Sequence, residues 1–198
     1  VKIINPQPSD QLIEIGPGHG AITDFLQASG APLQLIELDT DLIPLLHQKY
    51  DALDNVTIRH LDALKLELDP TINNHKVVGN LPYNISSPLL IRLLYQSSQV
   101  EQMIFMLQKE VVQRICAEPG TKLFGRLSVM LQHRFDCIGH LTIPPEAFNP
   151  RPKVDSQIIQ LMRKQNPTPV KLPVLEQLVK QAFAMRRKTI RNNLKKVV

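Results

Sequence analysis

The sequence predicts an α/β fold: a mainly parallel β-sheet with helices on both faces and an antiparallel strand pair at one end. Over residues 1–80, short apolar runs typical of buried strands alternate with stretches of helical periodicity. This alternation predicts right-handed crossovers between parallel strands, with helices covering each face of the sheet. Further along, two strand-like runs are joined by a proline-rich stretch without a helix, which predicts the antiparallel pair.

The individual strands are expected where aliphatic runs are bounded by turn-forming residues. These strands are Gln11–Ile15, Leu33–Leu38, Val56–His60, Val77–Gly79, Gln102–Leu107, Cys137–Ile143 and Gln157–Met162. Helices are expected where apolar residues recur at helical spacing. These helices are Ala21–Ala28, Asp41–Tyr50, Ser87–Tyr95, Lys109–Ala117, Arg126–His133, Val174–Met185 and Thr189–Val198. We expect Ser86 or Ser87 to cap the third helix, with Pro88 in its first turn.

The chain is expected to divide into two domains. Three prolines in Gln165–Pro173 predict a linker, so residues 1–166 form the sheet domain and residues 167–198 begin a truncated helical domain. Of the net charge of +5, residues 167–198 carry eight Lys or Arg and one Glu, giving +7. The other residues carry 15 basic and 17 acidic side chains, giving −2. A basic tail favours a polyanionic partner, although a solvated cationic helix face would give the same pattern.

The composition excludes several classes of protein. Hydrophobic residues make up 43% and charged residues 21%, as in soluble globular proteins, and no apolar run approaches the roughly 20 residues of a membrane span. Two cysteines, Cys116 and Cys137, are too few for a disulfide framework, and we expect a reducing, cytoplasmic location. The histidines and cysteines show no short ligand spacing, so we expect no metal site.

Glycines follow the first expected strand in the run Glu14-Ile15-Gly16-Pro17-Gly18-His19-Gly20. Glycine lets the backbone turn sharply and approach a ligand, to which the following helix presents its N-terminus. Glu37 stands 21 residues after Gly16, at the end of the second expected strand, where a carboxylate can accept both hydroxyls of a ribose. With Ala21 the loop also matches the dinucleotide pattern G-x-G-x-x-A, so NAD binding stays an alternative, as does a plain tight turn.

A second polar position follows the third expected strand. Asp62, next to Ala63, has a carboxylate that can accept a hydrogen bond from the exocyclic amine of an adenine ring. A helix cap or turn aspartate is the simpler interpretation of this position taken alone.

The tetrapeptide Asn80-Leu81-Pro82-Tyr83 follows the fourth expected strand and suits methylation of an amino group on a base. The lone pair of such a nitrogen is delocalised into the ring. Acceptors from the Asn80 side chain and from the carbonyl of Leu81 or Pro82 can bond both N–H hydrogens and localise that pair. Proline restricts the local chain, and the Tyr83 ring offers a surface on which an extruded base stacks.

The segments EIGPGHG, IELD, DA and NLPYNISSP, in this order, resemble a Rossmann-like class I S-adenosylmethionine-dependent methyltransferase. More narrowly, they are similar to the ribosomal RNA adenine N6,N6-dimethyltransferases, and most to the kasugamycin-resistance type that acts on small-subunit (16S) rRNA. The segments FMLQKEV, GRLSV, PEAFNPRPKVDS and FAMRRKTIRN agree with this resemblance. The macrolide-resistance enzymes that act on large-subunit rRNA, which usually carry isoleucine at the position of Leu81, are the alternative.

The resemblance implies a role for each candidate residue. S-adenosylmethionine is expected to bind Glu14, Gly16, Gly18, Gly20, Glu37, Leu38, Asp62, Ala63 and Asn80. The target adenine is expected to contact Asn80, Leu81, Pro82, Tyr83 and Phe148, unless Phe148 is a core aromatic residue beneath its loop. The rRNA is expected to contact Arg186, Arg187, Lys188 and Arg191. The implied partner is 16S rRNA in the immature 30S subunit, where two adjacent adenines in a 3′-terminal hairpin loop are dimethylated by a monomeric enzyme.

One segment of the family has no counterpart in this sequence. A Gln-Asn-Phe-Leu-like motif that closes over the cofactor precedes the first strand in the family, whereas this chain begins at Val1. We therefore expect a fragment trimmed at both ends, with weakened cofactor binding. Two functions of other classes stay open: a nicotinamide-dependent oxidoreductase, and a non-catalytic assembly factor that grips pre-ribosomal RNA.

Overall fold

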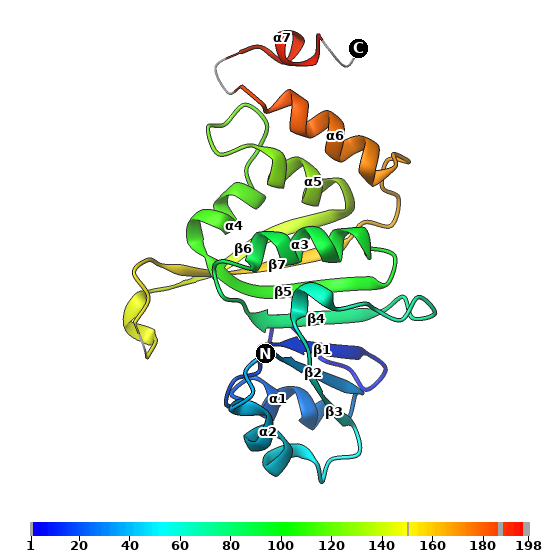
Figure 1. Cartoon of the computed structure of the whole chain (residues 1–198), viewed down its shortest axis with the longest axis vertical. Helices are drawn as coiled ribbons and strands as arrows, with labels where there is room; N and C mark the ends of the chain where they lie inside the picture. Colours follow the sequence, from blue (N-terminus) through cyan, green and yellow to red (C-terminus); the bar gives the residue numbers. More distant parts are fainter. Residues whose placement is uncertain (1, 150, 186–187, 196–198) are drawn as a thin grey trace.

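A seven-stranded sheet forms the centre of the protein in the computed structural model, which describes residues 2–149, 151–185 and 188–195 (Figure 1). The strand order is β3-β2-β1-β4-β5-β7-β6. The five strands from β1 to β5 run parallel, and β6 and β7 form the predicted antiparallel pair at one end. Strand β7 also runs antiparallel to β5, a pairing that the sequence did not specify. The strands are β1 Gln11–Ile15, β2 Leu33–Glu37, β3 Val56–His60, β4 His75–Asn80, β5 Val100–Gln108, β6 Phe135–Ile143 and β7 Ser156–Arg163.

Among the described residues, five helices lie between strands along the chain, and α6 and α7 follow the last strand. They are α1 Thr23–Leu26, α2 Leu42–Tyr50, α3 Ser86–Tyr95, α4 Lys109–Ile115, α5 Arg126–Arg134, α6 Leu172–Ala182 and α7 Ile190–Leu194. Short 3₁₀ turns follow α1 at Gln27–Ser29, β3 at Ala63–Lys65 and β6 at Pro145–Ala147. None of the helices in the described part of the chain is long and apolar enough to cross a membrane.

Both faces of the sheet are covered, because neighbouring residues of a strand point to opposite faces. On one face, Leu12 and Val78 belong to an apolar cluster with Leu26 of α1 and Leu46 of α2. A larger cluster on the other face joins strands β1, β4 and β5 to helices α3, α4, α5 and α6 through buried aliphatic side chains.

The structure corrects some expected boundaries. Neither Ser86 nor Ser87 caps α3, since Ser86 is already its first residue and donates its hydroxyl hydrogen to the carbonyl oxygen of Tyr83 at 3.1 Å. Helix α6 begins two residues earlier than expected and includes Pro173 in its first turn, where proline costs no hydrogen bond. Strand β4 is longer than expected because the polar residues His75 and Lys76 also pair with β1 and β5.

Strand β1 lies where the sheet order reverses, with β2 on one side and β4 on the other. In sheets of this kind, ligands bind beyond the carboxyl ends of the strands at that position. The register aligns Ile15 with Ile36 and with Gly79, so the segments that follow β1, β2 and β4 leave the same edge. The loop between β6 and β7 projects from this edge too, because Ser156 pairs with Gln108 at the end of β5 (Figure 1).

Candidate active site

The glycine loop lies directly beside the end of β4. Gly16 and Gly18 have φ angles of 67° and 57°, a left-handed conformation that disfavours other residues. A β-carbon on Gly16 would lie 3.8 Å from the backbone oxygen of Asn80, so the loop and the tetrapeptide adjoin one another. On Gly20, a β-carbon would collide with the phenol hydroxyl group of Tyr50 in α2. The loop therefore leaves space for a ligand next to its backbone, and the contact with Tyr50 of α2 holds it in place.

The carboxylate of Glu37 links the glycine loop to the end of β2. It accepts backbone N–H hydrogen bonds from Leu38 at 2.8 Å, from Asp39 at 2.9 Å and from Gly18 at 3.3 Å. Only 8% of the residue is exposed, whereas 61% of Leu38 is exposed beside it. A fixed acceptor next to an exposed apolar side chain suits a ribose and the flat base attached to it.

Glu14 lies beneath the loop and is 1% exposed. The hydroxyl group of Thr23, at the start of α1, donates a hydrogen bond to its carboxylate at 2.6 Å. Burial raises the pKa of Glu14 from 4.5 to about 7, in spite of the Thr23 hydrogen bond that lowers it, and the charges of Asp24 and Glu37 raise it further. In this structure Glu14 ties β1 to α1, and its predicted contact with the cofactor stays a prediction.

Asp62 caps the 3₁₀ turn that follows it, which is the simpler of the two interpretations that the sequence left open. Its Oδ1 accepts a hydrogen bond from the backbone N–H of Leu64 at 2.9 Å, at the start of the 3₁₀ turn Ala63–Lys65. Its Oδ2 has no partner among the described residues and is still able to accept from a ligand amine. Strand β3, which precedes Asp62, is in register with Glu37 through His60, so both acids lie along the same sheet edge.

The tetrapeptide leaves β4 at the same edge. Asn80 is exposed, whereas Leu81 is 1% exposed and its N–H donates to the carbonyl oxygen of Met106 at 3.3 Å. Tyr83 is 38% exposed, and its hydroxyl oxygen lies 3.3 Å from the Oγ of Ser156. The segment around the anchored Leu81 thus leaves Asn80, Pro82 and Tyr83 exposed, with Asn80 next to the glycine loop.

Phe148 is half-buried in the loop between β6 and β7. Its N–H donates to the carbonyl oxygen of Pro145 at 3.2 Å, which closes the 3₁₀ turn before it. The other end of this loop is fixed by Asp155, which pairs with the Lys109 ammonium at 3.1 Å. The loop carrying Phe148 and the segment carrying Tyr83 therefore meet at Ser156, a residue to which the sequence motifs assign no role.

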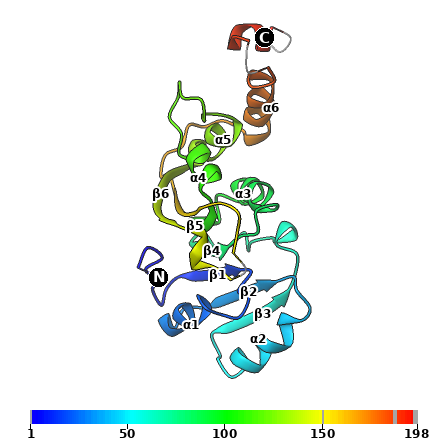
Figure 2. The ribbon, with the colours of Figure 1, turned by 90° about the vertical axis from the view of Figure 1, so that its left-hand side faces the viewer.

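Two of the four predicted RNA-contacting residues, Lys188 and Arg191, belong to the described part of the chain. Arg186 and Arg187 are outside the described residues. Lys188 and Arg191 are exposed on and before α7, which lies at the opposite end of the molecule from α2 in both views (Figure 1, Figure 2).

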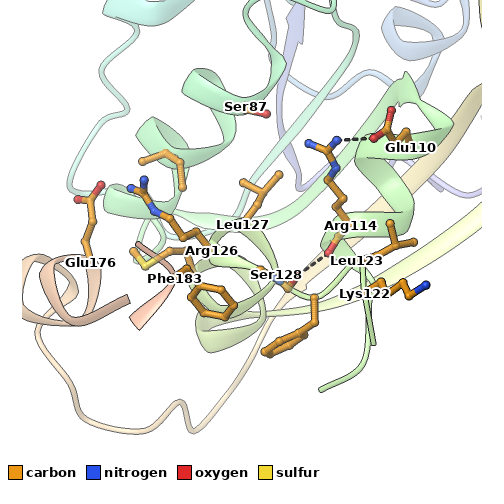
Figure 3. Close-up of a pocket in the computed structure, with 14 residues that line it drawn as sticks. Ser87, Glu110, Arg114, Lys122, Leu123, Arg126, Leu127, Ser128, Glu176 and Phe183 are labelled. Atoms are coloured by element: carbon orange, nitrogen blue, oxygen red, sulfur yellow. Dashed lines mark hydrogen bonds and ion pairs between the residues drawn. The ribbon is translucent and has the colours of Figure 1, made fainter. Parts of the chain in front are cut away.

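A separate cavity of about 530 Å³ lies among α3, α4, α5 and α6 (Figure 3). It contains none of the residues predicted to bind the cofactor or the target base. Phe124 and Phe183 form part of its wall, with ring centroids 6.2 Å apart, and connect α6 to the segment before α5. Arg114, Lys122 and Arg126 place basic groups around it, together with the acids Glu110 and Glu176.

The sheet topology, the glycine cradle after β1 and the fixed acid after β2 define a class I methyltransferase that uses S-adenosylmethionine. A family model described as ribosomal RNA adenine dimethylase matches residues 1–198. The chain belongs to the ribosomal RNA adenine dimethylase family. This membership decides in favour of S-adenosylmethionine over NAD, two cofactors that the glycine loop alone did not distinguish.

Relatives and solved structures agree with this membership. The "Ribosomal RNA small subunit methyltransferase A" of Coxiella burnetii (strain CbuG_Q212) is 48% identical over 202 residues, covering 100% of this chain and 78% of that protein. The protein of the same name from Saccharophagus degradans is 49% identical, covering 98% and 75%. A dimethyladenosine transferase from Plasmodium falciparum superposes with a TM-score of 0.88 at 27% identity, covering 98% of this chain and 70% of that chain. The 23S rRNA methyltransferase ErmE superposes with a TM-score of 0.81 at 26% identity, covering 98% and 78%.

Proposed function

We propose that this chain transfers methyl groups from S-adenosylmethionine to the N6 atoms of two adjacent adenines in 16S rRNA, giving dimethyladenine. The relatives at 48% and 49% identity are named for the small ribosomal subunit, whereas the 23S enzyme ErmE is only 26% identical. The small-subunit substrate is therefore favoured over the large-subunit alternative. The observation that carries the chemistry is the position of Asn80 directly beside Gly16 at the carboxyl edge of the sheet.

The residues at this edge fit the cofactor. Gly16 and Gly18 leave room for close approach, and the Glu37 carboxylate is fixed by three backbone N–H groups to receive ribose hydroxyls. Asp62 offers its second oxygen to the adenine amine, with Leu38 and Ala63 beside the base. When bound, S-adenosylmethionine supplies an activated methyl group, so positioning of the acceptor amine is the main task left to the chain.

The tetrapeptide holds that amine. The Asn80 side-chain oxygen and a backbone carbonyl of Leu81 or Pro82 accept the two N–H hydrogens and draw the nitrogen towards tetrahedral geometry. Buried Leu81 supports this geometry because it anchors the segment to β5. Tyr83 and Phe148, from segments that meet at Ser156, hold the base between two rings. A strong general base is unnecessary, because the nitrogen proton becomes acidic only after alkylation.

Residues 167–198 form a separate, RNA-facing part in this proposal. Their net charge of +7 supports contact with rRNA phosphates, through Arg186, Arg187, Lys188 and Arg191. Leu172 and Val179 of α6 nevertheless belong to the same apolar cluster as β5, so this part is anchored firmly on the sheet domain. We infer a monomer that acts on the immature 30S subunit in the cytoplasm.

The decisive experiment is transfer of tritiated methyl groups to 30S subunits with unmethylated 16S rRNA. The modified base is identified by mass spectrometry. Dimethyladenine in 16S rRNA is the expected product, and methylation confined to 23S rRNA would favour the large-subunit alternative. Calorimetry that detects NAD(H) binding without S-adenosylmethionine binding would overturn the proposal.

The variant Asn80→Ala separates catalysis from RNA binding. It should abolish methyl transfer and leave most of the RNA affinity, because the phosphate contacts lie elsewhere. If Asn80→Ala cells assemble ribosomes normally with unmethylated rRNA, the chain acts as an assembly factor and not through its chemistry.

A further inference from the structure

The hydroxyl groups of Tyr83 and Ser156 lie 3.3 Å apart, although 73 residues separate them in the sequence. Ser156 is 3% exposed, so its hydroxyl group has little access to water as an alternative partner. Burying a hydroxyl group without a hydrogen bond costs folding free energy. The hydroxyl group of Ser156 avoids this cost because it is hydrogen-bonded to the hydroxyl group of Tyr83.

Tyr83 is held at a second point. Its carbonyl oxygen accepts a hydrogen bond from the Ser86 hydroxyl at 3.1 Å, at the first residue of α3. One hydrogen bond therefore fixes the backbone of Tyr83 and the other fixes the far end of its ring. Tyr83 as a whole remains 38% exposed, which leaves part of the residue available to a ligand.

Ser156 is a rigid point of attachment. It is the first residue of β7 and pairs with Gln108 of β5 on one side and with Ile143 of β6 on the other. The preceding residue, Asp155, accepts the backbone N–H of Lys109 at 3.0 Å and pairs with the Lys109 ammonium at 3.1 Å. Ser156 therefore also marks the fixed base of the loop that carries Phe148.

We propose that Ser156 is a positioning residue for methyl transfer, whose hydroxyl group holds the Tyr83 ring in the orientation that stacks on the target adenine. This inference rests on the proposed function and adds a residue to it. Ser156 contacts neither substrate nor cofactor in this role. It restricts movement of the ring about the Cα–Cβ bond before the base arrives, and it fixes the spacing between Tyr83 and the loop that carries Phe148.

A double-mutant cycle tests the proposal. Ser156→Ala and Tyr83→Phe each remove one half of the same hydrogen bond, and both retain an aromatic ring at position 83. With 30S subunits as substrate and saturating S-adenosylmethionine, each variant should lower kcat/KM for the subunit by about twofold to tenfold. The double variant should lose no more than the larger single loss, because the hydrogen bond is already absent. Losses that multiply, or an unchanged Ser156→Ala enzyme, would overturn the proposal.

Two further measurements separate positioning from general destabilisation. The affinity for S-adenosylmethionine should be unchanged in Ser156→Ala, as in the matched control Ser98→Ala, an exposed serine before β5. The chain has three tyrosines, so ¹³C-labelled tyrosine gives three ring signals in NMR. Ser156→Ala should shift the Tyr83 signal and leave those of Tyr50 and Tyr95 in place; an unmoved Tyr83 signal contradicts the proposal. Absence of methyl transfer by the wild-type chain would instead contradict the proposed function.

Discussion

The hydroxyl group of Thr23 donates a 2.6 Å hydrogen bond to the carboxylate of Glu14, and the pair is buried beneath the glycine loop. Glu14 belongs to β1 and Thr23 begins α1, so the bond spans the turn that forms the cradle. The same burial that protects this bond disfavours the ionised carboxylate and raises its pKa to about 7. The glycine loop after β1 is therefore supported by a carboxyl group, that of Glu14, whose charge changes near neutral pH.

Glu14 should make the folded state less stable as pH rises from 4.5 to about 7. Because its pKa is raised on folding, the folded chain binds the proton more tightly, and this advantage is complete below 4.5 and lost as pH passes 7. Relative to Glu14→Gln, the wild-type free energy of unfolding should fall by about 3 kcal/mol over that range. Urea unfolding at several pH values measures the difference. The exposed control Glu101→Gln should show none, and parallel curves for Glu14→Gln would refute the assignment.

Gly79 should tolerate no side chain. A β-carbon there would overlap the carbonyl oxygen of Ile15 in the adjacent strand β1, and neither backbone can move without breaking the β1–β4 pairing. Gly79→Ala should therefore destabilise the protein by about 2–3 kcal/mol or more, as measured by thermal unfolding. Gly125→Ala is the matched control, because its β-carbon would meet its nearest neighbour at an ordinary 3.8 Å. Equal melting temperatures for the two variants would contradict this reasoning.

Asp10 and Lys76 form a buried ion pair with an Oδ2–Nζ distance of 2.7 Å and side-chain exposures of 8% and 10%. Asp10 also accepts the backbone N–H of Gln7, which ties the segment before β1 to β4. Asp10→Ala leaves a buried ammonium without its counter-charge and should cost about 3–5 kcal/mol in urea unfolding.

The double variant Asp10→Leu/Lys76→Met tests whether the unpaired charge of Lys76 causes the loss of stability in Asp10→Ala. It should recover much of the stability that Asp10→Ala loses, since no unpaired charge remains. A double variant as unstable as the single one would show that lost packing, and not the unpaired charge, is responsible.

Phe148→Ala should lower the rate of methyl transfer by about fivefold to 100-fold, the range expected for loss of one aromatic surface stacked on a base. Phe148→Tyr keeps the ring and should retain most of the activity. Affinity for S-adenosylmethionine, measured by calorimetry, should be the same in both variants. If the two variants lose activity equally with unchanged melting temperatures, Phe148 does not act by stacking.

Local patterns in the sequence were sufficient to predict the strands, the order of the helices and the glycine loop. Periodicity 2 or 3.6 depends on neighbouring residues only, and the left-handed turns at Gly16 and Gly18 are a property of glycine itself. The family prediction depended instead on a resemblance, carried by the segments EIGPGHG, IELD, DA and NLPYNISSP, to the rRNA adenine dimethylases, and the family match confirms it.

Only the tertiary structure decided how these residues meet. The sequence pattern did not reveal that Asp62 caps the 3₁₀ turn after β3, and it wrongly predicted a helix cap at Ser86 or Ser87. The raised pKa of Glu14 could not be predicted from the sequence, because it depends on burial of the carboxylate in the folded protein. The hydrogen bond between Tyr83 and Ser156 could not be predicted either, because it depends on the register of β7 beside β5. Burial and register arise from packing between segments far apart in the chain, and local propensities carry no information about them.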